Sequence, residues 1–104
     1  MRKSGKSSPI PVVWADQAKE DLERIFDHIA ENFSIELAIQ RTELIISEVD
    51  GLSRFPRKGS ISLRFNEIRE LIVESNTVYY RVNDADIVVA SIRPRRTTPK
   101  NKPD

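Results

Sequence analysis

The sequence predicts an α+β domain with the element order β-α-α-β-β-β, in which a helix hairpin packs on one face of a mainly antiparallel sheet. Three observations predict this fold. Apolar residues recur at helical spacing in two segments before residue 56, short β-branched and aromatic runs follow residue 66, and polar turn residues separate those runs. A chain of 104 residues is long enough for one hydrophobic core and too short for two, so we expect a single domain.

The two ends of the chain differ from its middle. Residues 1–10 are rich in Lys, Ser and Gly, a composition that cannot offset the entropy of ordering, and residues 97–104 continue a basic C-terminal stretch. We expect a disordered arm over residues 1–10, one folded domain over residues 11–96 and a flexible tail. The N-terminus lacks an apolar secretory signal, and no apolar run approaches the ~20 residues of a membrane span, which favours a cytoplasmic protein without membrane contact.

The first half of the chain contains a short strand and two helices. Residues 12–14 are a β-type run, and Asp16 suits the N-cap of the helix that follows. Ser34 can cap a second helix, which we expect to end at Pro56. In the first helix, over residues 18–33, acidic side chains lie between regularly spaced apolar ones, which predicts an acidic outer face. The acidic residues of this region are Asp16, Glu20, Asp21, Glu23, Asp27 and Glu31.

The second half predicts a three-stranded antiparallel meander over residues 67–74, 77–82 and 86–93. Strand alternation places Tyr79 and Arg81 together on the face that is more exposed. Alternation also places Arg69 with Leu71 and Val73 on one face of the first of these strands. We expect Arg69 to neighbour Tyr79 and Arg81 across the ladder.

The charges of the chain are balanced in total but unevenly distributed. The sequence has 17 Lys plus Arg against 16 Asp plus Glu, so its bulk charge does not mark a nucleic-acid binder. Two interpretations of the sheet arginines stay open: a basic and aromatic face that binds phosphate or carboxylate, or a solvated face with Arg–Glu pairs of modest energy. For the basic C-terminal end, where Pro94 follows Arg93, the alternatives are a binding segment and a solubilising tail.

Several kinds of site are absent from the sequence. It has no cysteine, a single histidine and three glycines, which excludes a disulfide framework, a Cys- or His-rich metal site and a glycine-rich phosphate loop. Ser and Thr hydroxyls have no histidine partner on the sheet, and we interpret His28 as a surface residue of the first helix. We expect no metal and no cofactor.

The order of five motifs resembles the RelE/ParE toxin superfamily, the toxin half of type II toxin–antitoxin modules. The motifs are VVWADQAKEDLERIFDHIAEN, LSRFPRKGS, IREL, VYYRV and IRPRR, and the resemblance covers roughly Val12 to Arg96. The positions that match the family pattern are Ala18, Asp21, Leu22, Ile25 and Ile29 in the first helix, Leu52, Phe55, Pro56 and Gly59 after the second helix, and Arg69, Glu70 and Leu71 in the strand.

The resemblance implies one of two activities. RelE-like members cut mRNA in the ribosome, with Lys and Arg residues of the sheet and a Tyr near the C-terminus, whereas ParE-like members poison DNA gyrase without nuclease activity. Here residues 67–73 contain no lysine, Thr77 stands where nucleases have an arginine, and no tyrosine follows Arg96. We therefore favour a gyrase-poisoning toxin of the plasmid-stabilisation type, with an mRNA endonuclease as the alternative. A third class is a decayed toxin that serves only as a corepressor.

The sequence also departs from the ParE-like pattern, because Arg93, His28 and Asn76 replace a usual His, Tyr and Tyr. The candidate residues for binding the target or the antitoxin are Arg69, Tyr79, Arg81, Arg93, Arg95 and Arg96. No catalytic residue is predicted unless the chain is a nuclease, in which case Arg69, Arg81 and Arg96 are the candidates.

The resemblance also implies the partners. They are a cognate antitoxin, DNA gyrase or else the ribosome and mRNA, and operator DNA only through the antitoxin. It further implies a homodimer or a toxin–antitoxin heterotetramer.

Overall fold

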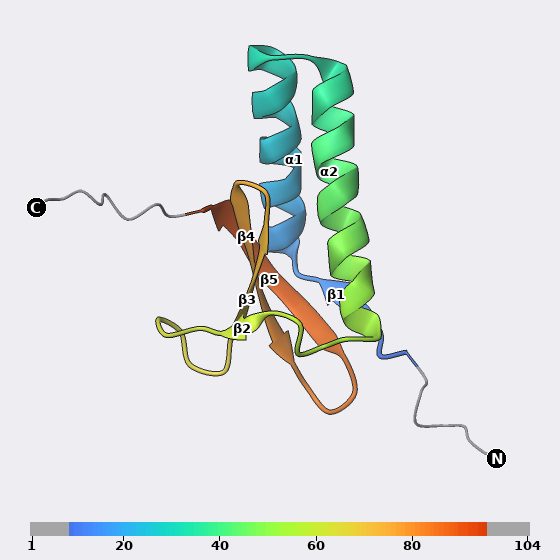
Figure 1. Ribbon diagram of the computed structural model, residues 1–104, viewed down its shortest axis with the longest axis vertical. Coiled ribbons are helices and arrows are strands. Elements are labelled where there is room, and N and C mark those ends of the chain that lie inside the picture. The colour runs from blue at the N-terminus through green and yellow to red at the C-terminus, as the bar shows by residue number, and fades with distance from the viewer. Residues whose placement is uncertain (1–8, 96–104) are drawn as a thin grey trace, which may run out of the picture.

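A computed structural model of the chain describes residues 9–95 and arranges them as two helices beside a five-stranded sheet (Figure 1). The predicted α+β fold and element order are confirmed, with one additional two-residue strand. The elements are β1 (Val12–Trp14), α1 (Asp16–Asn32), α2 (Ile35–Asp50), the 3-10 turn η2 (Gly51–Ser53), β2 (Ser60–Ile61), β3 (Arg69–Val73), β4 (Asn76–Val82) and β5 (Ile87–Pro94).

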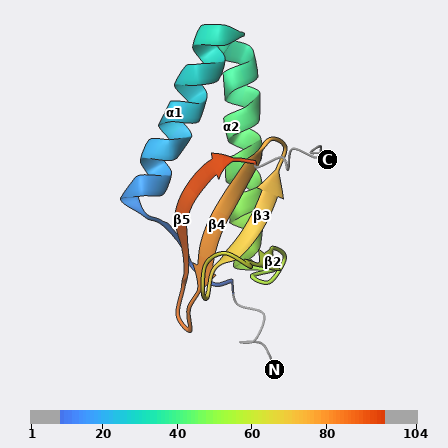
Figure 2. The same cartoon turned by 90° about the vertical axis from the view of Figure 1, so that its left-hand side faces the viewer.

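The sheet has the strand order β1-β5-β4-β3-β2. Figure 2 shows β5, β4 and β3 side by side, with β2 beyond β3. Strands β2 to β5 pair antiparallel with their neighbours, and β1 pairs parallel with β5. The sheet is therefore mainly antiparallel, as predicted. The parallel pair is possible because the connection from β1 to β5 is long and contains both helices and strands β2 to β4.

The two helices begin at different kinds of cap. Ser34 caps α2 as predicted, since its Oγ accepts the Leu37 backbone N–H at 3.1 Å. The prediction of Asp16 as the cap of α1 is wrong: Ala15 occupies that position without a side-chain cap, and its own N–H donates to the Val89 carbonyl at 2.9 Å. This sheet bond holds Ala15 extended, so Asp16 is already helical.

The second helix ends before the predicted stop at Pro56. Its last residue is Asp50, after which the chain tightens into η2. The Gly51 N–H bonds to the Ser47 and Val49 oxygens and so satisfies two of the carbonyls at the end of the helix. Neither α1 nor α2, the helices of the described chain, is long and apolar enough to cross a membrane.

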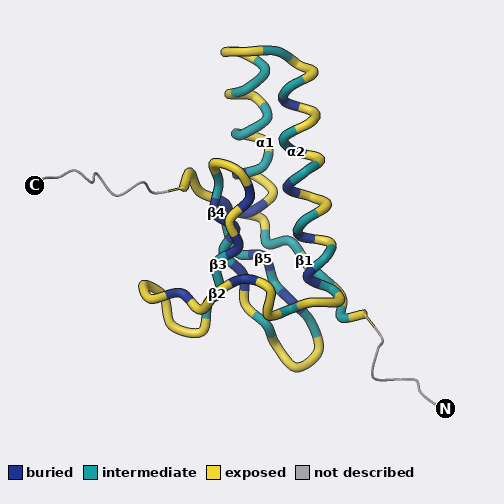
Figure 3. Tube along the Cα trace, viewed as in Figure 1, coloured by how far each residue is buried: buried dark blue, intermediate teal, exposed yellow. Residues whose placement is uncertain are grey.

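The hydrophobic core lies between the hairpin and one face of the sheet (Figure 3). A bulge helps to fill it: Tyr79 pairs with Ser91 but Tyr80 pairs with Val89, which leaves Ala90 without a partner on β4. Because of this extra residue, Val89 and Ile92 both point inward. The core residues are Ala18, Ile45, Val49, Leu52, Leu71, Val73, Val78, Tyr80, Ile87, Val89 and Ile92.

The predicted acidic face of α1 is wrong for Asp21, which is only 4% exposed. Its carboxylate accepts the Ile92 backbone N–H at 2.9 Å, the Gln17 amide at 2.9 Å and the Arg24 guanidinium at 2.6 Å. A buried carboxylate with three donors is well satisfied. Asp21 thus joins α1 to β5 immediately before Arg93.

Residues 1–8 of the arm predicted over residues 1–10, and the whole tail predicted over residues 97–104, lie outside the described residues. Ile10, at the end of the predicted arm, packs against the core, and its N–H donates to the Ser53 carbonyl at 3.0 Å.

Candidate functional site

A buried tyrosine holds the loop that carries the FPRKG motif. The Tyr80 hydroxyl donates to the Pro56 carbonyl at 2.8 Å and accepts the Gly59 N–H at 2.9 Å. Burial raises the pKa of Tyr80 above its usual value, and the Gly59 N–H and the Arg69 charge oppose this effect in part. The phenol is therefore protonated at neutral pH and can donate to Pro56.

Only glycine fits at residue 59. A Cβ there would lie 2.7 Å from the Glu70 carbonyl oxygen and 2.8 Å from the Tyr80 hydroxyl. The Gly59 carbonyl in turn accepts the Arg69 Nη1 at 2.7 Å. The family-like residues Pro56, Gly59 and Arg69 therefore form one packed unit around Tyr80.

The position of Arg69 corrects the sequence analysis. Arg69 pairs with Tyr80 across the β3–β4 ladder, and both side chains lie on the face that the helices cover. Tyr79 and Arg81 flank Tyr80 in the chain and thus point to the opposite face. The expectation that Arg69 neighbours Tyr79 and Arg81 on one exposed face is wrong.

The sheet face opposite the helices, here called the open face, holds the other described candidates. Glu70 pairs with Tyr79, and Thr77 pairs with Arg93. Arg81 and Arg93 are exposed, whereas Tyr79 is half-buried. The open face is formed by Glu70, Ile72, Thr77, Tyr79, Arg81, Val88, Ser91 and Arg93.

The remaining candidates extend from the end of β5. The Arg95 N–H donates to the Ser75 carbonyl at 2.7 Å, which fixes Arg95 beside the β3–β4 turn. Arg96 lies outside the described residues. In residues 9–95, neither Arg81, Arg93 nor Arg95 has a carboxylate within salt-bridge distance. The solvated interpretation with cross-strand Arg–Glu pairs therefore finds no support at these three arginines.

The sequence analysis missed an apolar patch beside these arginines. It consists of Ile61, Leu63, Phe65 and Ile72, whose exposed fractions are 66%, 100%, 50% and 50%. Apolar side chains clustered at such exposure are typical of interaction surfaces. Their signal in the sequence is the alternation of Ile61, Leu63 and Phe65 with polar residues after Gly59.

The loop that carries the apolar patch is ordered by local contacts. The buried Ser62 hydroxyl accepts the backbone N–H groups of Arg64 and Phe65 at 3.1 and 3.0 Å. The Phe65 ring meets Tyr79 edge to face, with centroids 5.6 Å apart. The patch is thus held against the open face.

A depression of about 440 Å³ joins the apolar patch to the open face. It is lined by Ile61, Leu63, Ile72 and Tyr79, with Arg64 and Arg95 among the polar residues of its wall. Such a mixture of aromatic, aliphatic and arginine side chains is the composition of protein–protein contact sites.

The structure offers little for metal chemistry. Across residues 9–95, no three His, Asp or Glu side chains are grouped so that they could hold a metal ion. His28 is exposed on α1, where Asn32 bonds to its ring and carbonyl oxygen. Its interpretation as a surface helix residue is confirmed.

The chain has a hairpin of helices on one face of a mainly antiparallel sheet and arginines on the other. The solved structures that share this fold include three of the RelE/ParE toxin superfamily. The chromosomal ParDE toxin–antitoxin system from P. aeruginosa matches with a TM-score of 0.76 and 22% identity, over 84% of this chain and 97% of the matched chain. The RelBE2 toxin–antitoxin complex from Mycobacterium tuberculosis matches with a TM-score of 0.63 and 19% identity, over 85% and 93%. The YoeB dimer from Staphylococcus aureus matches with a TM-score of 0.57 and 18% identity, over 86% and 100%.

The sequence itself identifies the family. Residues 12–99 match the family described as ParE toxin of type II toxin-antitoxin system, parDE. The chain therefore belongs to the ParE toxin family and is a toxin of the type II toxin–antitoxin class. No curated protein matches the sequence.

Proposed function

We propose that this toxin inhibits growth by poisoning DNA gyrase through protein–protein contact and that a cognate antitoxin neutralises it in the cytoplasm. The observation that carries the proposal is the apolar patch on the edge of the open face. Leu63 is fully exposed in an ordered loop. An exposed leucine lowers solubility, and a binding partner that covers it would explain why it is there.

The chemistry of the open face supports contact over cleavage. Cutting RNA requires groups that take and give a proton, and arginine stays charged at physiological pH. The described strands of the sheet contain neither lysine nor histidine. Arg81, Arg93 and Arg95 are suited instead to the carboxylates of a protein partner, which guanidinium groups bind through paired hydrogen bonds.

The helix hairpin supports the antitoxin part of the proposal. It extends beyond the sheet (Figure 1), and Ile35, Ile39 and Ile46 on α2 are 59%, 43% and 39% exposed. These residues lie on one side of the helix, because offsets of four and eleven bring them within ~40° of each other. A segment that folds on binding, such as an antitoxin helix, can cover this stripe. The toxin–antitoxin complexes among the similar structures are consistent with such a partner.

One observation favours the alternative of an mRNA endonuclease. Glu70 lies opposite Tyr79 on the open face, next to arginines that can hold phosphate. A carboxylate and a phenol are groups that can move protons. Glu70 of this pair is therefore included in the test below.

The test is to induce the chain without its antitoxin and to follow DNA, RNA and protein synthesis separately. We expect DNA synthesis to stop first. We expect Leu63→Glu to lose growth inhibition, because a charge is placed in the contact, while Phe33→Glu, at an equally apolar exposed residue of the hairpin tip, keeps it. An early stop of translation with cut transcripts, lost in Glu70→Gln, would instead establish the endonuclease.

A further inference from the structure

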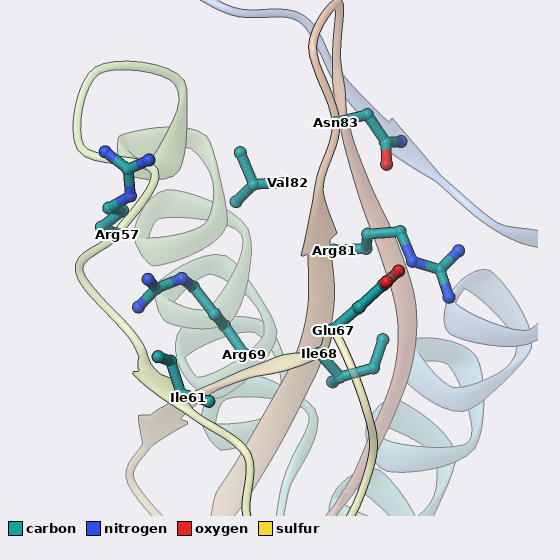
Figure 4. Close-up of a pocket in the computed structure, with 8 residues that line it drawn as sticks. All are labelled: Arg57, Ile61, Glu67, Ile68, Arg69, Arg81, Val82 and Asn83. Atoms are coloured by element: carbon teal, nitrogen blue, oxygen red, sulfur yellow. The ribbon is translucent and has the colours of Figure 1, made fainter.

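A second concavity, where β3 begins and β4 ends, borders the apolar patch and shares Ile61 with it. Its volume is about 350 Å³, at the small end of the ~300–1,000 Å³ typical of small-molecule sites. Figure 4 shows Arg57, Arg69 and Val82 on one side of β4, with Arg81 and Glu67 on the other. The two arginines on the Val82 side are the feature of interest.

Arg69 is held in place before any ligand arrives. It is half-buried, and its Nη1 donates to the Gly59 carbonyl at 2.7 Å. Gly59 is itself fixed by the Tyr80 hydroxyl at 2.9 Å. A guanidinium has five N–H donors, so most of those on Arg69 remain available in a fixed orientation.

Arg57 adds a second positive charge from the same loop that Tyr80 anchors. In the described part of the chain, neither Arg57 nor Arg69 has a carboxylate within 4.0 Å. The neighbouring Lys58 is different, because it pairs with Glu48 at 2.8 Å. Two arginines without acidic partners, one of them half-buried, form a site for an anion.

The surroundings indicate which anion. A phosphate monoester carries about −1.5 to −2 charges at neutral pH and matches two guanidinium groups better than a carboxylate with one charge does. Ile61 and Val82 supply apolar wall beside the arginines. At the rim, Asn83 uses its amide N–H on Asp86 at 2.8 Å, which leaves its oxygen as an acceptor.

We propose that Arg57 and Arg69 form a binding site for the phosphate of a nucleotide, with the sugar or base against Ile61 and Val82. Glu67 and Asn83 on the rim are acceptors for sugar hydroxyls or base amino groups. The ligand is either a free mononucleotide or the 5′ end of a nucleic-acid strand. The site shares Ile61 with the apolar patch, but its charged groups, Arg57 and Arg69, lie outside that patch, so phosphate binding does not require the proposed gyrase contact.

The test is a calorimetric titration of the purified chain at about 0.15 M salt, where non-specific surface binding is screened. The probes are AMP, inorganic phosphate, adenosine and a 5′-phosphorylated oligonucleotide. We expect saturable binding of AMP, none of adenosine, and shifts of the Gly59 and Val82 amide signals in NMR spectra. Tighter binding of AMP or of the oligonucleotide identifies the source of the phosphate.

Variants decide whether Arg57 carries the binding. Arg57→Ala should weaken AMP binding about tenfold or more, since it removes charge-assisted hydrogen bonds. Arg54→Ala is the matched control, because Arg54 is exposed nearby but does not line the concavity. The proposal is overturned if AMP does not bind, if adenosine binds equally well, or if Arg54→Ala weakens binding as much as Arg57→Ala.

Discussion

Replacing Asp21 by alanine removes the acceptor that joins α1 to the last strand. The carboxylate is 4% exposed and accepts the Ile92 N–H from 71 residues away in the chain. Without it, this amide has no partner in a part of the sheet where Ile92 is 2% exposed. The Arg24 guanidinium loses its acceptor as well, although its side chain is 62% exposed and can turn to water.

The structure sets the size of the effect. A hydrogen bond to a charged group contributes about 1.5–3 kcal/mol, and the loss of the bond from the Ile92 amide is the largest part. The pair with Arg24 adds at most about 1 kcal/mol, because solvent screens it. We expect Asp21→Ala to lower the free energy of unfolding by about 2–4 kcal/mol. Asp21→Asn should lose about half of that, since its amide oxygen still accepts from Ile92.

The assay is urea unfolding at pH 7, followed by amide hydrogen exchange at Ile92. Asp27→Ala is the control, because Asp27 is an exposed acid of the same helix and should change stability by no more than about 0.5 kcal/mol. If Asp21→Ala unfolds at the same urea concentration as Asp27→Ala, and the Ile92 amide exchanges no faster, then the carboxylate does not hold β5 and the reasoning fails.

Two further predictions concern the loop around Tyr80. Gly59→Ala should lower the free energy of unfolding by about 1–3 kcal/mol, because the new Cβ would lie 2.7 Å from a backbone oxygen. Gly51→Ala should raise it by about 0.4–1 kcal/mol, because Gly51 has a helical backbone and no atom within 4 Å of the new Cβ. Equal effects of the two variants in urea unfolding would refute the packing argument. Tyr80→Phe should cost about 1–3 kcal/mol at pH 7, since the buried Gly59 N–H loses its acceptor. The pKa of Tyr80 is raised in the folded state, so the folded protein retains a proton that the unfolded chain releases from about pH 10. Stability of the wild type should therefore fall as the pH rises above about 10, and Tyr80→Phe should remove that part of the fall; identical pH profiles would contradict it.

The sequence predicted the fold well because its helical and strand patterns agree with the final packing. Ala38, Ile45 and Val49 are among the apolar residues that recur at helical spacing before residue 56, and all three are buried. Ser34 caps the second helix as predicted. Local patterns of this kind are set by periodicity alone, so they are readable before the tertiary structure is known.

The burial of Asp21 was missed because its charge was taken to indicate exposure, although its position in the helix indicated burial. Asp21 lies three residues after Ala18 and four before Ile25, which is the inward side of the helix. That spacing was the available signal. Its partner, the Ile92 amide, is far away in sequence, and no local pattern could have revealed it.

The candidate site was predicted only in part, since it depends on strand pairing. Alternation correctly predicted which residues of each single strand share a face. It could not predict that Arg69 pairs with Tyr80 on the face that the helices cover, because that pairing depends on the tertiary structure. The exposed residues Leu63 and Phe65 lie in a loop, because β2 has only two residues and ends at Ile61. The Ser62 hydroxyl orders this loop. Alternation with polar residues marks these side chains in the sequence, but their grouping with Ile72 into one patch follows from the fold.

The most direct test of the central claim is a gyrase cleavage assay with purified components. DNA gyrase and supercoiled DNA are incubated with the wild-type chain, with Leu63→Glu or with Phe33→Glu, and cleaved DNA trapped on the enzyme is measured. We expect the wild type and Phe33→Glu to accumulate cleaved complexes and Leu63→Glu to form few or none. Absence of cleaved complexes with a folded wild-type chain, together with cut mRNA in a ribosome assay, would contradict the account.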